Sequence, residues 1–286
     1  MTPVPAASTP ALQPDLAHFI EIALPVCDRF GLALAGGGAL RAHGLAACPP
    51  ESLTLVMSGT TDLPGAAAEL ARAYRAADCE VTDRPGTPRA EQLSVQLPWG
   101  GGRHLVYLRK EPLAHQPVRL PLRAHGRYGT DVSEAAETTD LSGGFESDRP
   151  GSADGTGAEV PVVALDDAAA LTTLLLADRG MPRDLVDVHA LTACFRPGEL
   201  LALATALDAE FQPAVLADRL DILAEAADGR YRARDLDAEQ IAELRRWALE
   251  WAQDLRLDLL ETQERPDGLH DPYLEGDYPE YTSDDL

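Results

Sequence analysis

The chain has 286 residues, enough for one large or two small domains, and its 45% hydrophobic content is ordinary for a soluble globular protein. A net charge of −23 argues against general binding to nucleic acid, because a phosphate backbone attracts basic rather than acidic surfaces. No apolar run is long enough to cross a membrane, and residues 1–14 lack the basic and apolar segments of a signal peptide. We therefore expect a cytoplasmic protein that has no membrane partner and binds nucleic acid weakly at most.

The first half of the chain alternates between helical and strand patterns. Residues 1–14 read as a flexible leader, and 12–29 as an amphipathic helix that Pro25 bends or ends. Three glycines at 36–38 predict a tight turn into a short helix, and 65–78 predict a longer one. The expected strands combine alternating or short apolar runs with flanking turn residues. They lie at 32–35, 52–58, 80–83, 91–98 and 103–109.

The second half of the chain has a different composition. Residues 128–159 are rich in Gly, Ser, Thr, Asp and Glu and nearly free of apolar side chains, which is typical of a disordered linker or insertion. The period then becomes helical, and Asp166 is the expected N-cap of the first helix. The next expected helix begins near Pro182. The further expected helices lie at 182–194, 197–210, 213–227 and 237–260. We therefore predict an α/β domain at 15–127, a helical domain at 160–260 and an acidic mobile tail at 261–286.

Metal-binding patterns are lacking in the sequence. The four cysteines lie far apart with no C-x-x-C pair, and the seven histidines are scattered. We therefore expect reduced thiols and no structural metal.

Two segments carry a family resemblance. The first is "LALAGGGALRAHGL" at 32–45, and the second is "VVALDDAAALTTLLLADRGMPRDLVDVHAL" at 162–191. Together they resemble the AbiEii-type toxins of bacterial toxin–antitoxin systems in both order and spacing. The glycine turn is weak evidence by itself, whereas "DDA" followed by "RDLVDVHAL" is much more specific. The resemblance extends over roughly residues 15–260.

This resemblance implies an α+β fold, the polymerase-β-like minimal nucleotidyltransferase fold, followed by a helical C-terminal domain. In such enzymes the glycine turn holds the triphosphate, and the next strand carries a D-x-D pair that binds two magnesium ions. A third carboxylate lies on a later strand. The positions that the resemblance assigns to nucleotide binding are Gly36, Gly37, Gly38, Arg41, Arg183 and Asp187.

The carboxylates of this pattern are replaced here. The D-x-D positions fall on Ser52 and Thr54, and the third carboxylate position falls on Tyr107. A lysine that the family often carries falls near Thr172. Magnesium prefers anionic oxygen ligands, which neutral hydroxyls do not supply. Of the nearby acids, Glu51 points to the opposite face of the strand.

Three functions therefore stay open. The first is an AbiEii-like protein that is catalytically impaired, a pseudoenzyme that retains nucleotide or partner binding, with a cognate antitoxin as the expected partner. The second is an active enzyme that moves NMP from NTP to an RNA or protein hydroxyl through a rebuilt metal site. The third is a non-catalytic interaction module. No cofactor is expected unless the second holds, in which case magnesium and NTP are needed.

Several of these residues also have a purely structural interpretation. The glycines can serve the turn alone, because glycine tolerates a positive φ. Asp184 and Asp187 lie near a helix N-terminus, where a negative charge is favourable. Arg183 can pair with one of these carboxylates instead of a phosphate.

Overall fold

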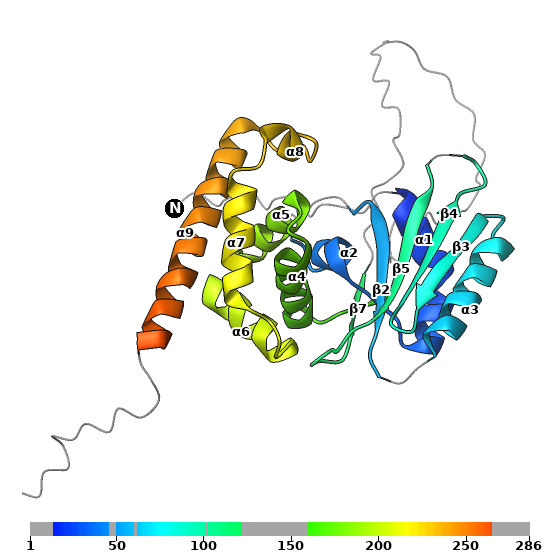
Figure 1. The fold of residues 1–286 in the computed structure, drawn as a ribbon. Coiled ribbons are helices and arrows are strands. Elements are labelled where there is room, and N and C mark those ends of the chain that lie inside the picture. Colours follow the sequence, from blue (N-terminus) through cyan, green and yellow to red (C-terminus); the bar gives the residue numbers. More distant parts are fainter. Residues whose placement is uncertain (1–13, 46–49, 60–61, 101, 122–158, 265–286) are drawn as a thin grey trace, which may run out of the picture.

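The computed structural model describes residues 14–45, 50–59, 62–100, 102–121 and 159–264. Figure 1 shows a mixed β-sheet with helices, beside which a group of C-terminal helices is arranged. Buried apolar side chains from both parts form one hydrophobic cluster. This arrangement confirms the predicted α+β class. The predicted leader, linker and tail lie almost entirely outside the described residues, so the predicted division into domains stays a prediction.

Within the described residues, seven strands form one sheet in the order β3-β4-β5-β2-β1-β7-β6. The parallel neighbours are β2 with β5 and β1 with β7, and the other neighbouring pairs are antiparallel. The strands are β1 (Ala33–Leu34), β2 (Ser52–Met57), β3 (Glu80–Thr87), β4 (Ala90–Gln96), β5 (His104–Lys110), β6 (Val118–Pro121) and β7 (Glu159–Val162).

β2 forms because its side chains alternate between two environments. Leu53 and Leu55 are buried in the core, whereas Ser52 and Thr54 point to the other face and are partly exposed. In the parallel pairing of β2 with β5, Thr54 lies beside Tyr107 and Val56 beside Arg109. The two central strands therefore present one row of polar side chains on the same face of the sheet.

Helices α1 (Pro14–Phe30) and α3 (Leu63–Ala76) cover one face of the sheet, and the short α2 (Gly36–Ala42) lies on the other side (Figure 1). Phe19 and Tyr74 join α1 to α3, with ring centroids 5.6 Å apart and a hydrogen bond from the Tyr74 hydroxyl to the Phe19 carbonyl. Of the two expectations for Pro25, that it bends or ends the first helix, the second is wrong, because α1 continues to Phe30. Proline removes one helical hydrogen bond, but buried side chains on both sides of it keep the helix in place as far as Phe30.

β7 is a strand that the sequence analysis does not predict. Val160 and Val162 are buried, whereas Glu159 is exposed and Pro161 partly so, which is the alternation of a strand over only four residues. Val162 pairs with Leu34 of β1, and the same strand pairs with β6. The sheet therefore contains strands from both sides of the 128–159 stretch, and the helical pattern begins only after β7.

The C-terminal helices agree with the expected ones, with α8 as an unexpected short addition. Their bounds are α4 (Leu165–Arg179), α5 (Pro182–Leu191), α6 (Pro197–Leu207), α7 (Pro213–Ala224), α8 (Asp228–Arg232) and α9 (Ala238–Glu264). Proline opens α5, α6 and α7, where its missing N–H costs nothing. Asp166 is not the N-cap of α4; that residue is Ala164, because the sheet ladder extends to Val163. No described helix is long and apolar enough to span a bilayer.

Candidate functional site

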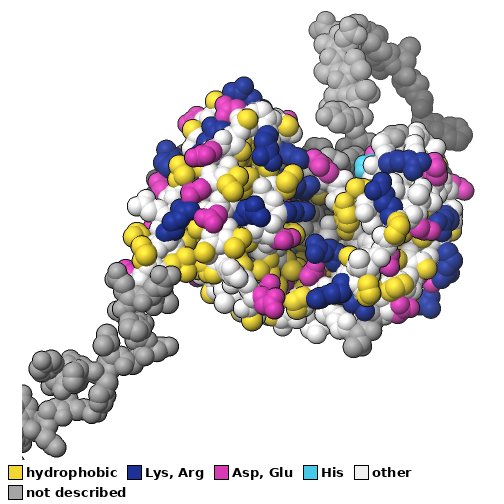
Figure 2. Space-filling model, viewed as in Figure 1, with side chains coloured by type: hydrophobic (Ala, Val, Ile, Leu, Met, Phe, Trp, Pro, Cys, Tyr) yellow, Lys and Arg dark blue, Asp and Glu magenta, His cyan; other side chains and the backbone are white. Residues whose placement is uncertain are grey.

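A cavity of about 650 Å³ lies between the sheet and the C-terminal helices. Figure 2 shows the hollow between these two parts, with Lys and Arg side chains on both rims. One wall consists of the turn before α2 and the exposed face of β2 and β5. The opposite wall consists of α4, α5, the segment 208–212 and the start of α7. The volume lies within the range of small-molecule sites in proteins, about 300–1,000 Å³.

The sheet wall contains the three positions where the family resemblance implies carboxylates. Ser52, Thr54 and Tyr107 all line the cavity. The two hydroxyls of β2 share one face of the sheet, and Tyr107 lies beside Thr54. The same face continues along β5 through Arg109 to Glu111, whose side chains form an ion pair at 2.8 Å. Period-2 spacing from Tyr107 could have identified these last two residues.

The glycine turn borders the cavity at Gly36 and Gly37. Gly36 has φ +60°, a left-handed conformation that favours glycine. The N-cap of α2 is Ala35, which has no side-chain cap, so the first N–H groups of this helix receive no acceptor from it. Two positions assigned to nucleotide binding, Gly38 and Arg41, do not line the cavity. Gly38 is instead packed against Leu34, whose side chain would lie 3.0 Å from an added Cβ.

The helical wall contains an apolar patch. Leu171, Leu174 and Leu175 on one face of α4 line the cavity together with Phe211 and Val215. The Thr172 hydroxyl, at the position where the family often has a lysine, donates a 2.7 Å hydrogen bond to the Ala168 carbonyl and is buried. Sequence reasoning misses Phe211 and Val215, because only tertiary packing brings the segment before α7 to the cavity.

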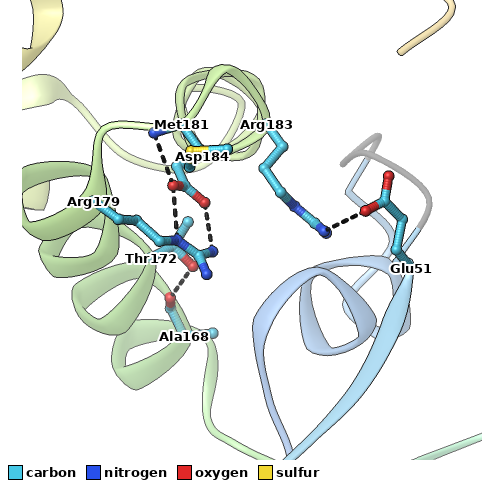
Figure 3. A network of polar contacts seen from close by, with 7 residues as sticks. All are labelled: Glu51, Ala168, Thr172, Arg179, Met181, Arg183 and Asp184. Atoms are coloured by element: carbon cyan, nitrogen blue, oxygen red, sulfur yellow. Dashed lines mark hydrogen bonds and ion pairs between the residues drawn. The ribbon is translucent and has the colours of Figure 1, made fainter. Parts of the chain in front are cut away.

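Asp184 has a structural role in this wall. Its carboxylate accepts two hydrogen bonds from Arg179, at 2.9 and 2.6 Å, and one from the Met181 N–H at 3.2 Å (Figure 3). Asp184 is only 2% exposed. These contacts join the end of α4 to the start of α5, which fixes the orientation of α5 and of the cavity residues that follow.

Arg183 and Asp187 are one helical turn apart on α5, and both line the cavity. Asp187 is buried. Arg183 extends across the edge of the cavity toward Glu51, at the start of β2, with 3.7 Å between Nη1 and Oε2 (Figure 3). Glu51 itself does not line the cavity, as the alternation of β2 predicts, and it also pairs with Arg234.

Asp167, the second aspartate of the "DDA" motif, binds the backbone of the segment that follows β5. Asp167 is 2% exposed, and its carboxylate accepts hydrogen bonds from the backbone N–H groups of Ala114 and His115, at 3.1 and 2.9 Å. The His115 ring nitrogen Nδ1 is 3.2 Å from the same carboxylate. Asp167 therefore positions the segment after Glu111 and is not itself a cavity residue.

Six carboxylates line the cavity, mostly on its helical side. Glu111 and Asp184 are each paired with an arginine. No group of three or more His, Cys, Asp or Glu side chains that could hold a metal ion occurs in the described part of the chain. The full set is Glu111, Asp178, Asp184, Asp187, Asp208 and Glu210.

Comparison with known proteins adds to this geometry. The family model described as "Nucleotidyl transferase AbiEii toxin, Type IV TA system" matches residues 29–270. No curated protein matches the chain significantly. The crystal structure of JHP933 from Helicobacter pylori is similar with 16% identity, 86% of this chain and 92% of that chain covered, and a TM-score of 0.39. MenT4, a nucleotidyltransferase toxin from Mycobacterium tuberculosis, is similar with 18% identity and a TM-score of 0.46. The similarity covers 84% of this chain and 91% of that chain.

The family match includes both sides of the cavity, from the strand before the glycine turn to the last C-terminal helix. The chain therefore belongs to the AbiEii nucleotidyltransferase toxin family of type IV toxin–antitoxin systems.

Proposed function

We propose that this protein binds a nucleotide in the cavity between its sheet and its C-terminal helices, in the cytoplasm, and that its capacity for two-metal nucleotidyl transfer is impaired. The observation that carries the proposal is the wall formed by Ser52, Thr54 and Tyr107. These residues lie on the cavity face at the positions that the family resemblance assigns to carboxylates. The site therefore has the shape of a nucleotidyltransferase site with a different donor set.

The donor set does not fit two magnesium ions. Magnesium requires near-octahedral coordination by hard, mostly anionic oxygens. Two aliphatic hydroxyls and a phenol are neutral at physiological pH. Two of the six cavity carboxylates, Glu111 and Asp184, are paired with arginines. The described residues also contain no group of three or more His, Cys, Asp or Glu side chains that could hold a metal ion.

Nucleotide binding is supported by three other properties of the cavity. Its volume of about 650 Å³ is in the range of small-molecule sites. The backbone at Gly36 and Gly37 offers N–H donors at one end, and Arg183 offers a positive charge. The leucine face of α4, with Phe211, offers an apolar surface of the kind on which a nucleobase can lie.

The test is a titration of the full chain with labelled ATP, CTP, GTP and UTP, with and without magnesium, combined with a transfer assay on RNA and on the chain itself. We expect saturable binding without label transfer. Leu175→Trp, which fills the cavity, should abolish binding, whereas the matched Leu257→Trp on the exposed side of α9 should not. If the wild type binds none of the four nucleotides, the proposal is wrong.

A working transferase with a rebuilt site is the second candidate. The observation in its favour is that Asp187 is a buried carboxylate on the cavity wall, with Glu111 on the opposite wall. If label transfer occurs, Asp187→Asn should abolish it, whereas Asp218→Asn, outside the cavity, should leave it unchanged. Transfer that survives Asp187→Asn would assign the chemistry elsewhere.

We also propose a protein partner, a cognate antitoxin, because the family description is that of a toxin in a two-component system. This proposal predicts that expression of the chain alone slows the growth of a bacterial host and that co-expression of its antitoxin restores growth. Growth that is normal without any second protein would argue against a toxin role.

A further inference from the structure

Arg183 is incompletely satisfied in the described structure. It is 83% buried, since its side chain is 17% exposed, and it lines the cavity. Its buried Nε has no hydrogen-bond partner among the described residues. The one ion pair found for it, with Glu51, is long at 3.7 Å. A guanidinium carries five N–H donors, so Arg183 has donors left for a ligand in the cavity.

Glu51 holds Arg183 from outside the cavity and is shared with a second arginine. One of its oxygens contacts Arg234, which precedes α9, and the other faces Arg183. Glu51 is 61% exposed, so water solvates it well and it can lose a partner at little cost. Glu51 therefore lies between Arg183 and Arg234, and a stronger contact with one arginine weakens its contact with the other.

The other arginines of the cavity are committed to partners inside it. Arg109 pairs with Glu111 at 2.8 Å, and Arg179 makes two hydrogen bonds to Asp184. Arg183 differs, because its ion-pair partner Glu51 is not a cavity residue. An anion that enters the cavity can therefore reach Arg183 without displacing a carboxylate from the cavity wall.

We infer that Arg183 binds the phosphate group of a metal-free ligand, and that Glu51 competes with this phosphate for Arg183 while Arg234 draws Glu51 away. This inference rests on the proposed nucleotide binding, to which the family resemblance already assigns Arg183, and adds the control of Arg183 by Glu51 and Arg234. A guanidinium binds phosphate through two parallel hydrogen bonds and needs no divalent ion. The hydroxyls of Ser52 and Thr54 supply no charged ligand for a magnesium ion on the phosphate, so the inference is for the free anion.

The competition predicts changes of opposite sign at residues that do not line the cavity. The probe is ATP in excess EDTA, titrated calorimetrically into the full chain. Glu51→Gln should bind ATP about two- to fivefold more tightly, and Arg234→Gln about two- to fivefold more weakly, which is the size of an exposed ion pair. Arg183→Gln should weaken binding at least about tenfold, the scale of a charge-assisted hydrogen bond.

Controls separate this effect from a general change in charge or fold. Glu80→Gln removes a carboxylate of the same kind, paired with Arg103 at 2.8 Å on the distant strand β3, and should leave ATP affinity unchanged. Thermal unfolding of each variant reports whether it folds. If Arg183→Gln does not fold, the two opposite shifts at Glu51 and Arg234 still decide the question.

The outcomes distinguish this inference from the proposed function. If the wild type binds ATP but Glu51→Gln leaves the affinity unchanged or lowers it, the competition is refuted and nucleotide binding stands. If magnesium tightens ATP binding by the wild type tenfold or more, the claim that the preferred ligand is free of metal is refuted. If the wild type does not bind ATP or any other nucleotide, both proposals fail together.

Discussion

Thr54 on β2 lies directly beside Tyr107 on β5 in the parallel pairing of the two central strands, and both side chains border the same cavity. Ser52 lies two residues before Thr54 on the same face of β2. Two carboxylates placed on this strand would therefore point into one space. The arrangement makes it possible to ask whether the metal site can be restored by changing side chains alone.

We predict that the double variant Ser52→Asp/Thr54→Asp gains magnesium binding. Without metal it should be less stable than the wild type by about 1–3 kcal/mol, because two close anions repel each other at the edge of a low-dielectric cavity. Magnesium should recover that loss, since it binds the native state preferentially. Thermal unfolding with and without magnesium measures both effects.

The matched control places the same two substitutions at Ser58 and Thr205, which are exposed hydroxyls outside the cavity. This control should be indifferent to magnesium. If the cavity variant is equally indifferent to magnesium, the side chains at 52 and 54 do not face one common pocket, and the assignment of the D-x-D positions is wrong. Renewed transfer is not expected, because Tyr107 still occupies the third position.

The order of the main elements could be predicted from sequence where the pattern is long or strongly periodic. β2 and β5 contain alternating apolar residues, and α5, α6 and α7 each begin with a proline. β1 lies within the predicted strand at 32–35, whereas β6 and β7 have only four residues each, too few alternations for a signal. Their place in the sheet depends on pairing with distant strands.

The candidate site divides in the same way. The shared face of Ser52 and Thr54 could be predicted from the period of two in a strand, whereas the assignment of Tyr107 comes from the family resemblance alone. The contacts of Glu51 with Arg183 and Arg234 could not, since they join residues that are more than a hundred positions apart in the chain. Long-range packing of the C-terminal helices decides that part of the site.

We predict that Arg179→Ala destabilises the protein more than Asp184→Asn does. Removing Arg179 leaves a carboxylate that is 2% exposed with only the Met181 N–H as a hydrogen-bond donor, which should cost about 3 kcal/mol. In the asparagine variant the single amide oxygen can still accept from Arg179 Nε and the Met181 N–H, whereas the bond from Arg179 Nη2 is lost, so the change should cost about 1–2 kcal/mol. Urea unfolding measures the difference, with Asp178→Asn, an exposed neighbour, as the control. Equal costs would mean that the charge of Asp184 contributes nothing.

We predict that stability falls as the pH drops below about 6.5, in part because of His189. Burial lowers the pKa of His189 from its ordinary value of 6.5, an effect that the charge of Glu243 partly opposes. Its ring lies 4.9 Å from that of Trp247. The unfolded chain therefore binds a proton at a higher pH than the folded chain does, so the stability that the neutral ring contributes is fully present above 6.5 and is lost below it.

The measurement for His189 is the free energy of unfolding at pH 7.5 and at pH 5.5. His189→Asn should reduce the difference between these two values relative to the wild type. A pH dependence that is unchanged in His189→Asn would show that other groups account for it.

The last prediction concerns Gly36, whose φ of +60° is unfavourable for most side chains but tolerable for asparagine. An added Cβ would lie 3.8 Å from the Thr54 side chain, an ordinary contact, so space is not the obstacle. Gly36→Ala should therefore cost about 1–2 kcal/mol through backbone strain alone, and Gly36→Asn clearly less. The two variants separate the role of the turn from that of the ligand. If Gly36→Asn is nearly as stable as the wild type yet binds nucleotide at least about tenfold more weakly, the bare backbone at this position contacts the ligand. If it retains both stability and affinity, Gly36 is required only to start α2.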